Sequence, residues 1–155
     1  MGTWQGKRIV AAVNGSEVSR DALQYALDLA EATSCAVTVL TAIQTRMPGY
    51  RAGYFSFVDR HILKELQEFA RSVLEEAARV AAGRGMSVEP VALEADQEVF
   101  EQIADYLEKV ADVAFLVMGS YGHSVRDRHI LGSTTQRLIM EIARRGLKVP
   151  VVVVP

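Results

Sequence analysis

Four residues with a fixed spacing, Gly119, Gly122, Gly132 and Ser133, could bind phosphate groups. The two residues at 119 and 122 follow an apolar run that is typical of a buried strand, and the other two come just before an expected helix. Glycine lets the backbone approach a ligand closely and adopt positive φ, so backbone N–H groups can line a concave anion site. The start of a helix adds unpaired N–H groups and a partial positive charge. The pattern predicts a phosphate-binding loop, or else glycines that serve only tight turns.

Polar side chains in the same segment suit binding better than catalysis. Ser133, Thr134 and Thr135 would add hydroxyl donors, and we expect His123 to act as a charge-assisted donor to phosphate. The spacing of His123 and His129 fits no known metal-binding pattern. We therefore expect neither metal ligands nor catalytic residues in this loop.

Short runs rich in Val and Ile alternate with longer amphipathic stretches along the chain. Period and length distinguish the two kinds of segment, since buried strands are short and apolar and helices repeat their apolar residues every three or four positions. Ser16 is placed to cap the first helix through its side-chain oxygen. We expect strands over 9–13, 36–43, 87–93, 113–118 and 151–154, and helices over 16–32, 59–82, 97–110 and 133–145.

This alternation predicts an α/β fold with a mostly parallel sheet, right-handed crossovers and helices on both faces. Pro90 lacks an N–H group for the strand ladder, so its strand is expected at an edge. In such sheets ligands bind beyond the carboxyl ends of the strands, where the strand order reverses. The segments after Val13 and after Met118 fit that position. We expect a single domain over residues 1–155.

Composition excludes several classes of partner. The 155 residues carry a net charge of −2, which gives no electrostatic reason to bind nucleic acid or an anionic membrane surface. One cysteine cannot form an internal disulfide. The start of the chain lacks the length and cleavage site of a signal peptide, and no apolar run approaches the roughly 20 residues of a membrane span. We therefore expect a cytoplasmic protein with no nucleic-acid and no membrane partner.

The spacing Gly119-x2-Gly122-x9-Gly132-Ser133 resembles the nucleotide-loop signature of the universal stress protein family. The stretches IVAAVNGSEVSRDAL at 9–23, VAFLVMGSYG at 113–122 and VPVVVV at 149–154 are similar to the family's first strand and helix, fourth strand and final strand. The resemblance covers nearly the whole chain apart from 44–60 and 83–97. It implies a five-stranded, parallel, open-twisted sheet in a Rossmann-like three-layer sandwich of the adenine nucleotide alpha hydrolase-like class.

The same resemblance implies a binding site for ATP, AMP or ADP, with or without Mg²⁺. Residues after the first strand would line the adenosine site, Ala42 would pack against adenine, and the glycine loop would hold the ribose and phosphates. The family usually has Asp where this chain has Asn14, which puts in doubt any metal contact or proton transfer by that residue. The expected nucleotide-binding residues are Ala12, Val13, Asn14, Ala42, Met118, Gly119, Ser120, Gly122, His123, Gly132, Ser133, Thr134 and Thr135.

The resemblance also implies a homodimer in which the last strands of two chains pair through Val151, Val152, Val153 and Val154. An uncharged Val-rich edge would otherwise invite aggregation. The expected function is a stress-response regulator whose nucleotide occupancy alters an interaction with an unidentified protein partner. Two alternatives remain open, a slow ATPase or phosphotransfer enzyme and a nucleotide-free dimeric scaffold. A flavodoxin-like electron carrier and a response-regulator receiver are the alternative interpretations of the fold.

Overall fold

A parallel sheet with the strand order β3-β2-β1-β4-β5 organises the molecule. The computed structural model describes residues 4–45, 56–122 and 131–155. Within these ranges the elements are, in chain order, β1 (Arg8–Ala12), α1 (Glu17–Thr33), β2 (Ala36–Gln44), α2 (Ser56–Gly83), β3 (Glu89–Ala95), α3 (Val99–Lys109), β4 (Val113–Gly119), α4 (Ser133–Arg145) and β5 (Val151–Val154).

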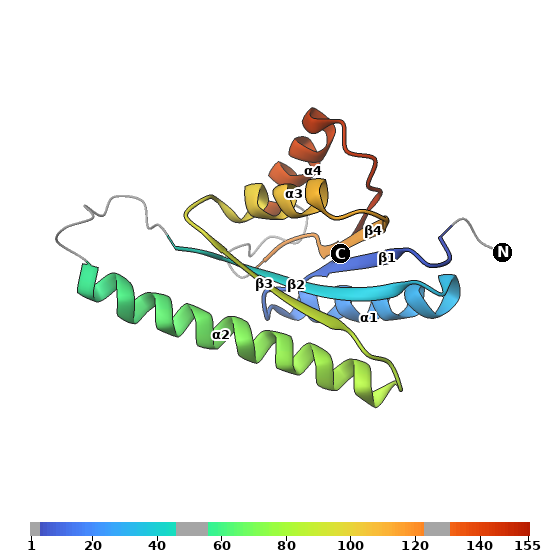
Figure 1. Cartoon of the computed structure of the whole chain (residues 1–155), viewed down its shortest axis with the longest axis horizontal. Coiled ribbons are helices and arrows are strands. Elements are labelled where there is room, and N and C mark those ends of the chain that lie inside the picture. Colours follow the sequence, from blue (N-terminus) through green and yellow to red (C-terminus); the bar gives the residue numbers. More distant parts are fainter. Residues whose placement is uncertain (1–3, 46–55, 123–130) are drawn as a thin grey trace.

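Helices cover both faces of the sheet, as the alternating pattern predicts. α1 and α2 lie on one face, and α3 and α4 lie on the other (Figure 1). Two apolar clusters result, one beneath each helix pair. Leu27 and Val39 belong to the cluster under α1 and α2, whereas Leu116 and Leu138 belong to the cluster under α3 and α4. The expected Rossmann-like three-layer architecture is confirmed.

The strand order reverses between β1 and β4, which lie side by side at the centre of the sheet. Both segments that were expected to meet at a reversal, the one after β1 and the one after β4, therefore leave the sheet at the same place. Pro90 lies in β3 at one edge, as predicted. β5 forms the other edge of the described sheet.

The apolar stripes of the helices mostly face the sheet, with one exception. Leu23, Ala26 and Leu27 of α1 lie three and four positions apart and are buried. Phe69 of α2 is the exception, at 52% exposed. Its ring approaches the turn after β1, because an ideal Cβ on Gly15 would lie 3.0 Å from Phe69 Cζ. α2 is long and runs past the sheet (Figure 1). No helix in the described residues is long and apolar enough to cross a membrane.

Candidate functional site

A cavity of about 300 Å³ opens at the carboxyl ends of the central strands. It lies where the strand order reverses, which is the position that open α/β sheets use for ligands. Residues from the ends of β1, β2 and β4 and from the starts of α3 and α4 line it. The lining comprises Ala12, Val13, Asn14, Ser19, Leu40, Thr41, Ala42, Val99, Ile103, Met118, Gly119, Tyr121, Gly122, Gly132, Ser133, Thr134 and Thr135.

The structure brings together nearly all the residues that the sequence predicts for the site. Eleven of the thirteen line the cavity, from Ala12 on β1 to Thr135 on α4. Ser120 does not line it; its N–H donates to the carbonyl of Val154 at 2.8 Å and its carbonyl accepts from Gly132 N–H at 2.7 Å. His123 lies outside the described residues.

The turn after β1 is fixed by its own side chains. The Asn14 side-chain oxygen accepts from Ser16 N–H at 3.0 Å, and Ser19 Oγ accepts from Asn14 N–H at 3.3 Å while donating to the Ser16 carbonyl at 2.9 Å. Ser16 Oγ accepts from Ser19 N–H at 3.3 Å, which is the predicted N-cap of α1. The start of α1 is therefore capped by the protein itself.

The start of α4 is arranged differently. Its N-cap residue is Gly132, which has no side chain to accept from the first-turn N–H groups, and the first turn contains no acidic residue. Ser133 and Thr134 are exposed in that first turn and line the cavity. No side chain among the described residues caps this start, and such a helix start directs its first N–H groups and a partial positive charge outward. This wall of the cavity therefore suits an anion.

Close packing explains two of the loop glycines. An ideal Cβ on Gly119 would lie 2.7 Å from Val18 Cγ1, and one on Gly132 would lie 3.0 Å from the Tyr121 Cα. An ideal Cβ on Gly122 would lie 3.1 Å from Asn14 Nδ2. The expectation of positive φ is wrong for these three glycines, because none of them adopts it. The lack of a side chain lets Gly132 approach the backbone of Tyr121, and it leaves room for the side chains of Val18 at Gly119 and Asn14 at Gly122.

The end of β2 offers backbone groups at the opposite wall. β1 and β2 pair up to Ala12 opposite Leu40, and Val13 N–H donates to the Leu40 carbonyl at 2.8 Å. Backbone groups alternate sides along a strand, so the N–H and C=O of Ala42 point to the same side as those of Leu40. β1 has ended there, and Ala42 is in register with Leu93 of β3 on its other side. A donor and an acceptor therefore face the space beyond the end of β1, where Ala42 lines the cavity.

One predicted hydroxyl has a structural partner. Thr135 is 4% exposed, and its Oγ1 donates to the Gly119 carbonyl at 2.9 Å. That bond ties the first turn of α4 to the end of β4. The Thr135 proton is thus used within the protein, while Ser133 and Thr134 remain exposed at the cavity.

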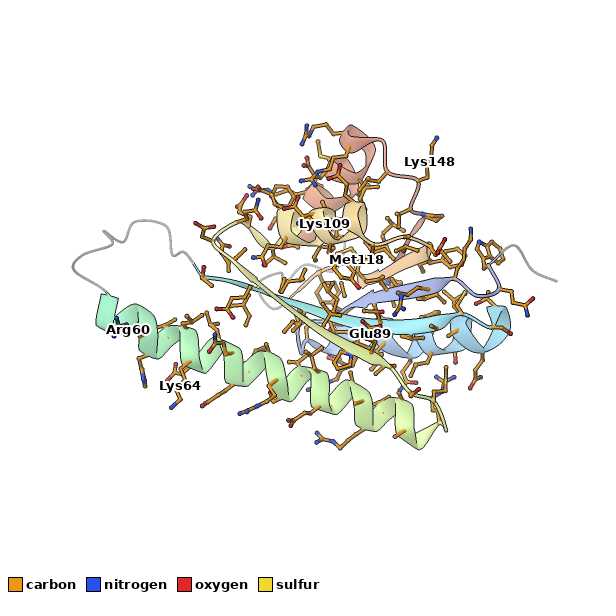
Figure 2. The ribbon with its side chains drawn as sticks, viewed as in Figure 1. Arg60, Lys64, Glu89, Lys109, Met118 and Lys148 are labelled. Carbon is orange, nitrogen blue, oxygen red and sulfur yellow. The ribbon has the colours of Figure 1, made fainter. Side chains whose placement is uncertain are left out.

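An apolar wall of the cavity includes two residues that were not expected at the site. Val99 and Ile103 on α3 line the cavity. Met118 lies between α3 and the sheet (Figure 2) and completes this wall. The four-residue spacing of Val99 and Ile103 indicates an apolar face of α3. Periodicity alone does not tell whether that face continues past the end of the sheet and into the cavity. Ser19, Leu40, Thr41 and Tyr121 also line the cavity without having been expected there.

An ion-pair network holds α4 against α3. Arg145 Nη1 lies 2.6 Å from Asp105 Oδ1 and 3.0 Å from Glu108 Oε2, and its Nε lies 2.8 Å from Glu141 Oε2. Hydrogen bonds from Arg144 and then from Arg145 lower the pKa of Glu141 to about 2. The network fixes the helix whose first turn faces the cavity.

An open parallel sheet with helices on both faces and a cavity at the reversal point defines a Rossmann-like α/β protein. The model of the universal stress protein family matches residues 6–155. The chain belongs to the universal stress protein family.

Solved structures agree with this assignment at the level of the fold. The universal stress protein UspA from Lactobacillus plantarum is 17% identical with a TM-score of 0.82, over 97% of this chain and 99% of that one. A universal stress protein in complex with cAMP is 21% identical with a TM-score of 0.67, over 96% and 97%. One from Archaeoglobus fulgidus in complex with dAMP is 20% identical with a TM-score of 0.62, over 99% and 100%. No curated protein shows significant sequence similarity to the chain.

Proposed function

We propose that this protein binds an adenine nucleotide, with ATP, AMP and ADP as the candidates. The observation that carries the proposal is a single cavity with an anion-suited wall at the start of α4 and, at Ala42, a backbone edge that no described strand covers. A nucleotide needs both kinds of wall at once. The two similar structures in complex with cAMP and dAMP support an adenine-containing ligand.

The base end of the cavity suits adenine. Adenine has a 6-amino donor beside the N1 acceptor, and Ala42 presents a C=O acceptor beside an N–H donor from one residue. The small side chains of Ala12 and Ala42 leave room for a flat ring, and Val99 and Ile103 supply an apolar surface against it. We therefore place the base between the end of β2 and α3.

The phosphates would lie at the start of α4. Backbone N–H groups of the first turn and the hydroxyls of Ser133 and Thr134 would donate to them. Among the described residues that line the cavity, none is acidic, and Asn14 stands at the position where the family usually has Asp. Phosphoryl transfer needs a carboxylate or its equivalent to hold Mg²⁺, so we propose binding with or without Mg²⁺ and no efficient turnover.

Calorimetry with ATP and with AMP, in the presence and absence of Mg²⁺, tests this proposal. The informative variant is Gly122→Ala, whose Cβ would lie 3.1 Å from Asn14 Nδ2 and so narrow the cavity between the turn after β1 and the turn after β4. The matched control is Gly83→Ala at the end of α2, where an added Cβ meets no atom within 4 Å.

We expect micromolar binding by the wild type, unchanged binding by Gly83→Ala, and a loss of about tenfold or more in affinity for Gly122→Ala. A well-folded wild type that binds neither nucleotide would refute the proposal and favour the nucleotide-free scaffold. Steady phosphate release with ATP would instead favour the slow ATPase.

We further propose a cytoplasmic homodimer, with one domain over residues 1–155, whose nucleotide occupancy alters binding to a protein partner. The C=O groups of Pro150 and Val154 face β4, where they accept from Leu116 and Ser120. By alternation, the backbone groups of Val151 and Val153 face away from the sheet. A second copy of β5 could pair with them and cover this edge.

Light scattering tests the dimer. The wild type is expected at twice the chain mass of 17.0 kDa. Val153→Lys should give a monomer, because a charge on a pairing edge opposes strand addition. The control is Ala92→Lys on the exposed side of the opposite edge strand, β3. A monomeric wild type, or a dimer that survives Val153→Lys and not Ala92→Lys, would place the interface elsewhere.

A further inference from the structure

One buried amide joins three segments near the base end of the cavity. Gln102 is 4% exposed on α3. Its Nε2 donates to the carbonyls of Ile43 at 2.9 Å and Gln97 at 2.9 Å, and lies 3.3 Å from the carbonyl of Ala95. These carbonyls belong to the end of β2, the turn before α3 and the end of β3. Three carbonyl oxygens that converge would repel one another without a donor between them.

The two walls of the proposed base site are direct neighbours of this amide. Ile43, which accepts from Gln102, follows Ala42, whose backbone edge faces the cavity. Gln102 itself precedes Ile103, whose side chain forms the opposite wall. The hydrogen bond between Gln102 and Ile43 therefore links the two walls, because each partner is the chain neighbour of a wall residue, Ala42 or Ile103.

Stability of the fold does not explain why a glutamine stands at position 102. The other amide atom, Oε1, is buried and has no hydrogen-bond partner within the described part of the chain. A buried acceptor without a partner destabilises the fold. An apolar side chain of similar length would avoid that cost but could not hold the three carbonyls in place.

We propose that Gln102 is a positioning residue that fixes the separation of the two walls of the base site and so sets the preference for adenine over guanine. This inference rests on the proposed adenine-nucleotide function. In the same pose, guanine would place its N1–H against the N–H of Ala42 and its O6 against the C=O of Ala42. Walls held at a fixed separation prevent the ring from sliding to relieve these two clashes.

Affinities of ATP, GTP and inorganic tripolyphosphate test the inference. They are compared for the wild type, Gln102→Met and Leu107→Val. Met keeps the length of the side chain and removes its hydrogen bonds. Leu107 is buried on the same helix, 3% exposed and outside the cavity lining, so Leu107→Val perturbs the packing of α3 without touching the amide.

We expect the wild type and Leu107→Val to prefer ATP. Gln102→Met should bind ATP about tenfold more weakly, the effect of losing about one hydrogen bond, with GTP and tripolyphosphate little changed. The preference for ATP over GTP should therefore fall in this variant alone. Tripolyphosphate reports on the start of α4, which Gln102 does not contact.

Three results would overturn the inference. If Gln102→Met keeps the wild-type preference for ATP over GTP, the positioning role is refuted. It is also refuted if the variant loses equal affinity for ATP and for tripolyphosphate, because that result indicates general damage to the fold. A wild type that binds ATP and GTP equally refutes it while leaving nucleotide binding intact, whereas a wild type that binds neither refutes the proposed function itself. If Gln102→Met does not fold, Gln102→Asn, which is one methylene shorter, should show the same fall in preference, and an unchanged preference would be equally decisive.

Discussion

Replacing Gly119 with alanine should create a defined overlap between β4 and α1. The new Cβ would lie 2.7 Å from Val18 Cγ1 and 3.1 Å from Val18 Cγ2, well inside the roughly 3.5–4.0 Å at which carbon atoms attract. Val18 is 2% exposed, and valine in a helix has essentially one χ1 rotamer, so it cannot turn away. Overpacking of this kind lowers the free energy of unfolding by about 1–3 kcal/mol.

A second substitution should relieve the overlap. Val18→Ala removes both methyl groups that the new Cβ would meet, and alone it should cost about 2–3 kcal/mol through lost burial and the space left behind. In the double variant the alanine at 119 occupies part of that space. The double variant should therefore be more stable than the sum of the single effects predicts, by about 1–3 kcal/mol.

Urea denaturation measures these differences. The single tryptophan of the chain, Trp4, packs with its ring centroid 5.1 Å from that of Phe115, so its fluorescence should report unfolding. Gly83→Ala is the control, because its added Cβ meets no atom within 4 Å. Additive effects, within about 0.5 kcal/mol, would refute the packing role of Gly119 and leave close approach of a ligand as the reason for a glycine there.

Two further predictions concern α4. Thr135→Val should lower the free energy of unfolding by about 1–3 kcal/mol, because the buried Gly119 carbonyl loses its hydroxyl donor; the exposed Thr134→Val is the control in urea denaturation, and equal midpoints for the two variants would contradict the prediction. Hydrogen bonds from Arg144 and Arg145 lower the pKa of Glu141 from 4.5 to about 2. The ionised Glu141 should therefore contribute fully to the free energy of unfolding above a pH of about 5, and this contribution should fall as the pH drops from about 4.5 toward 2. The stability difference between wild type and Glu141→Gln should therefore shrink between pH 7 and pH 3, and a difference that stays constant would contradict it.

The sequence predicts the fold well because the deciding signals are local. Apolar runs between amphipathic stretches define the strands, and Pro90 assigns β3 to an edge before any contact is known. The two segments expected at a reversal of strand order, after Val13 and after Met118, follow β1 and β4, which are neighbours in the sheet. Eleven of the expected binding residues then line one cavity.

The remaining features depend on contacts between segments that are distant in sequence. Gly119 is placed against Val18, and Thr135 finds the Gly119 carbonyl, only after α1 and α4 have packed on the sheet. Gln102 looks in the sequence like a polar residue on a helix surface, yet it is buried among carbonyls from three segments. No periodicity marks such a residue, since its partners come from β2 and β3.

Main-chain groups form much of two cavity walls, the edge at Ala42 and the start of α4, and this affects which substitutions the site can accept during evolution. Both walls present main-chain groups, and every residue type except proline carries the same N–H and C=O groups. Selection on such a site acts on backbone shape and on the small volume of a few side chains, and it leaves most residue types free to drift. The shape of such a site can therefore persist while sequences diverge, as the fold itself does at 17–21% identity.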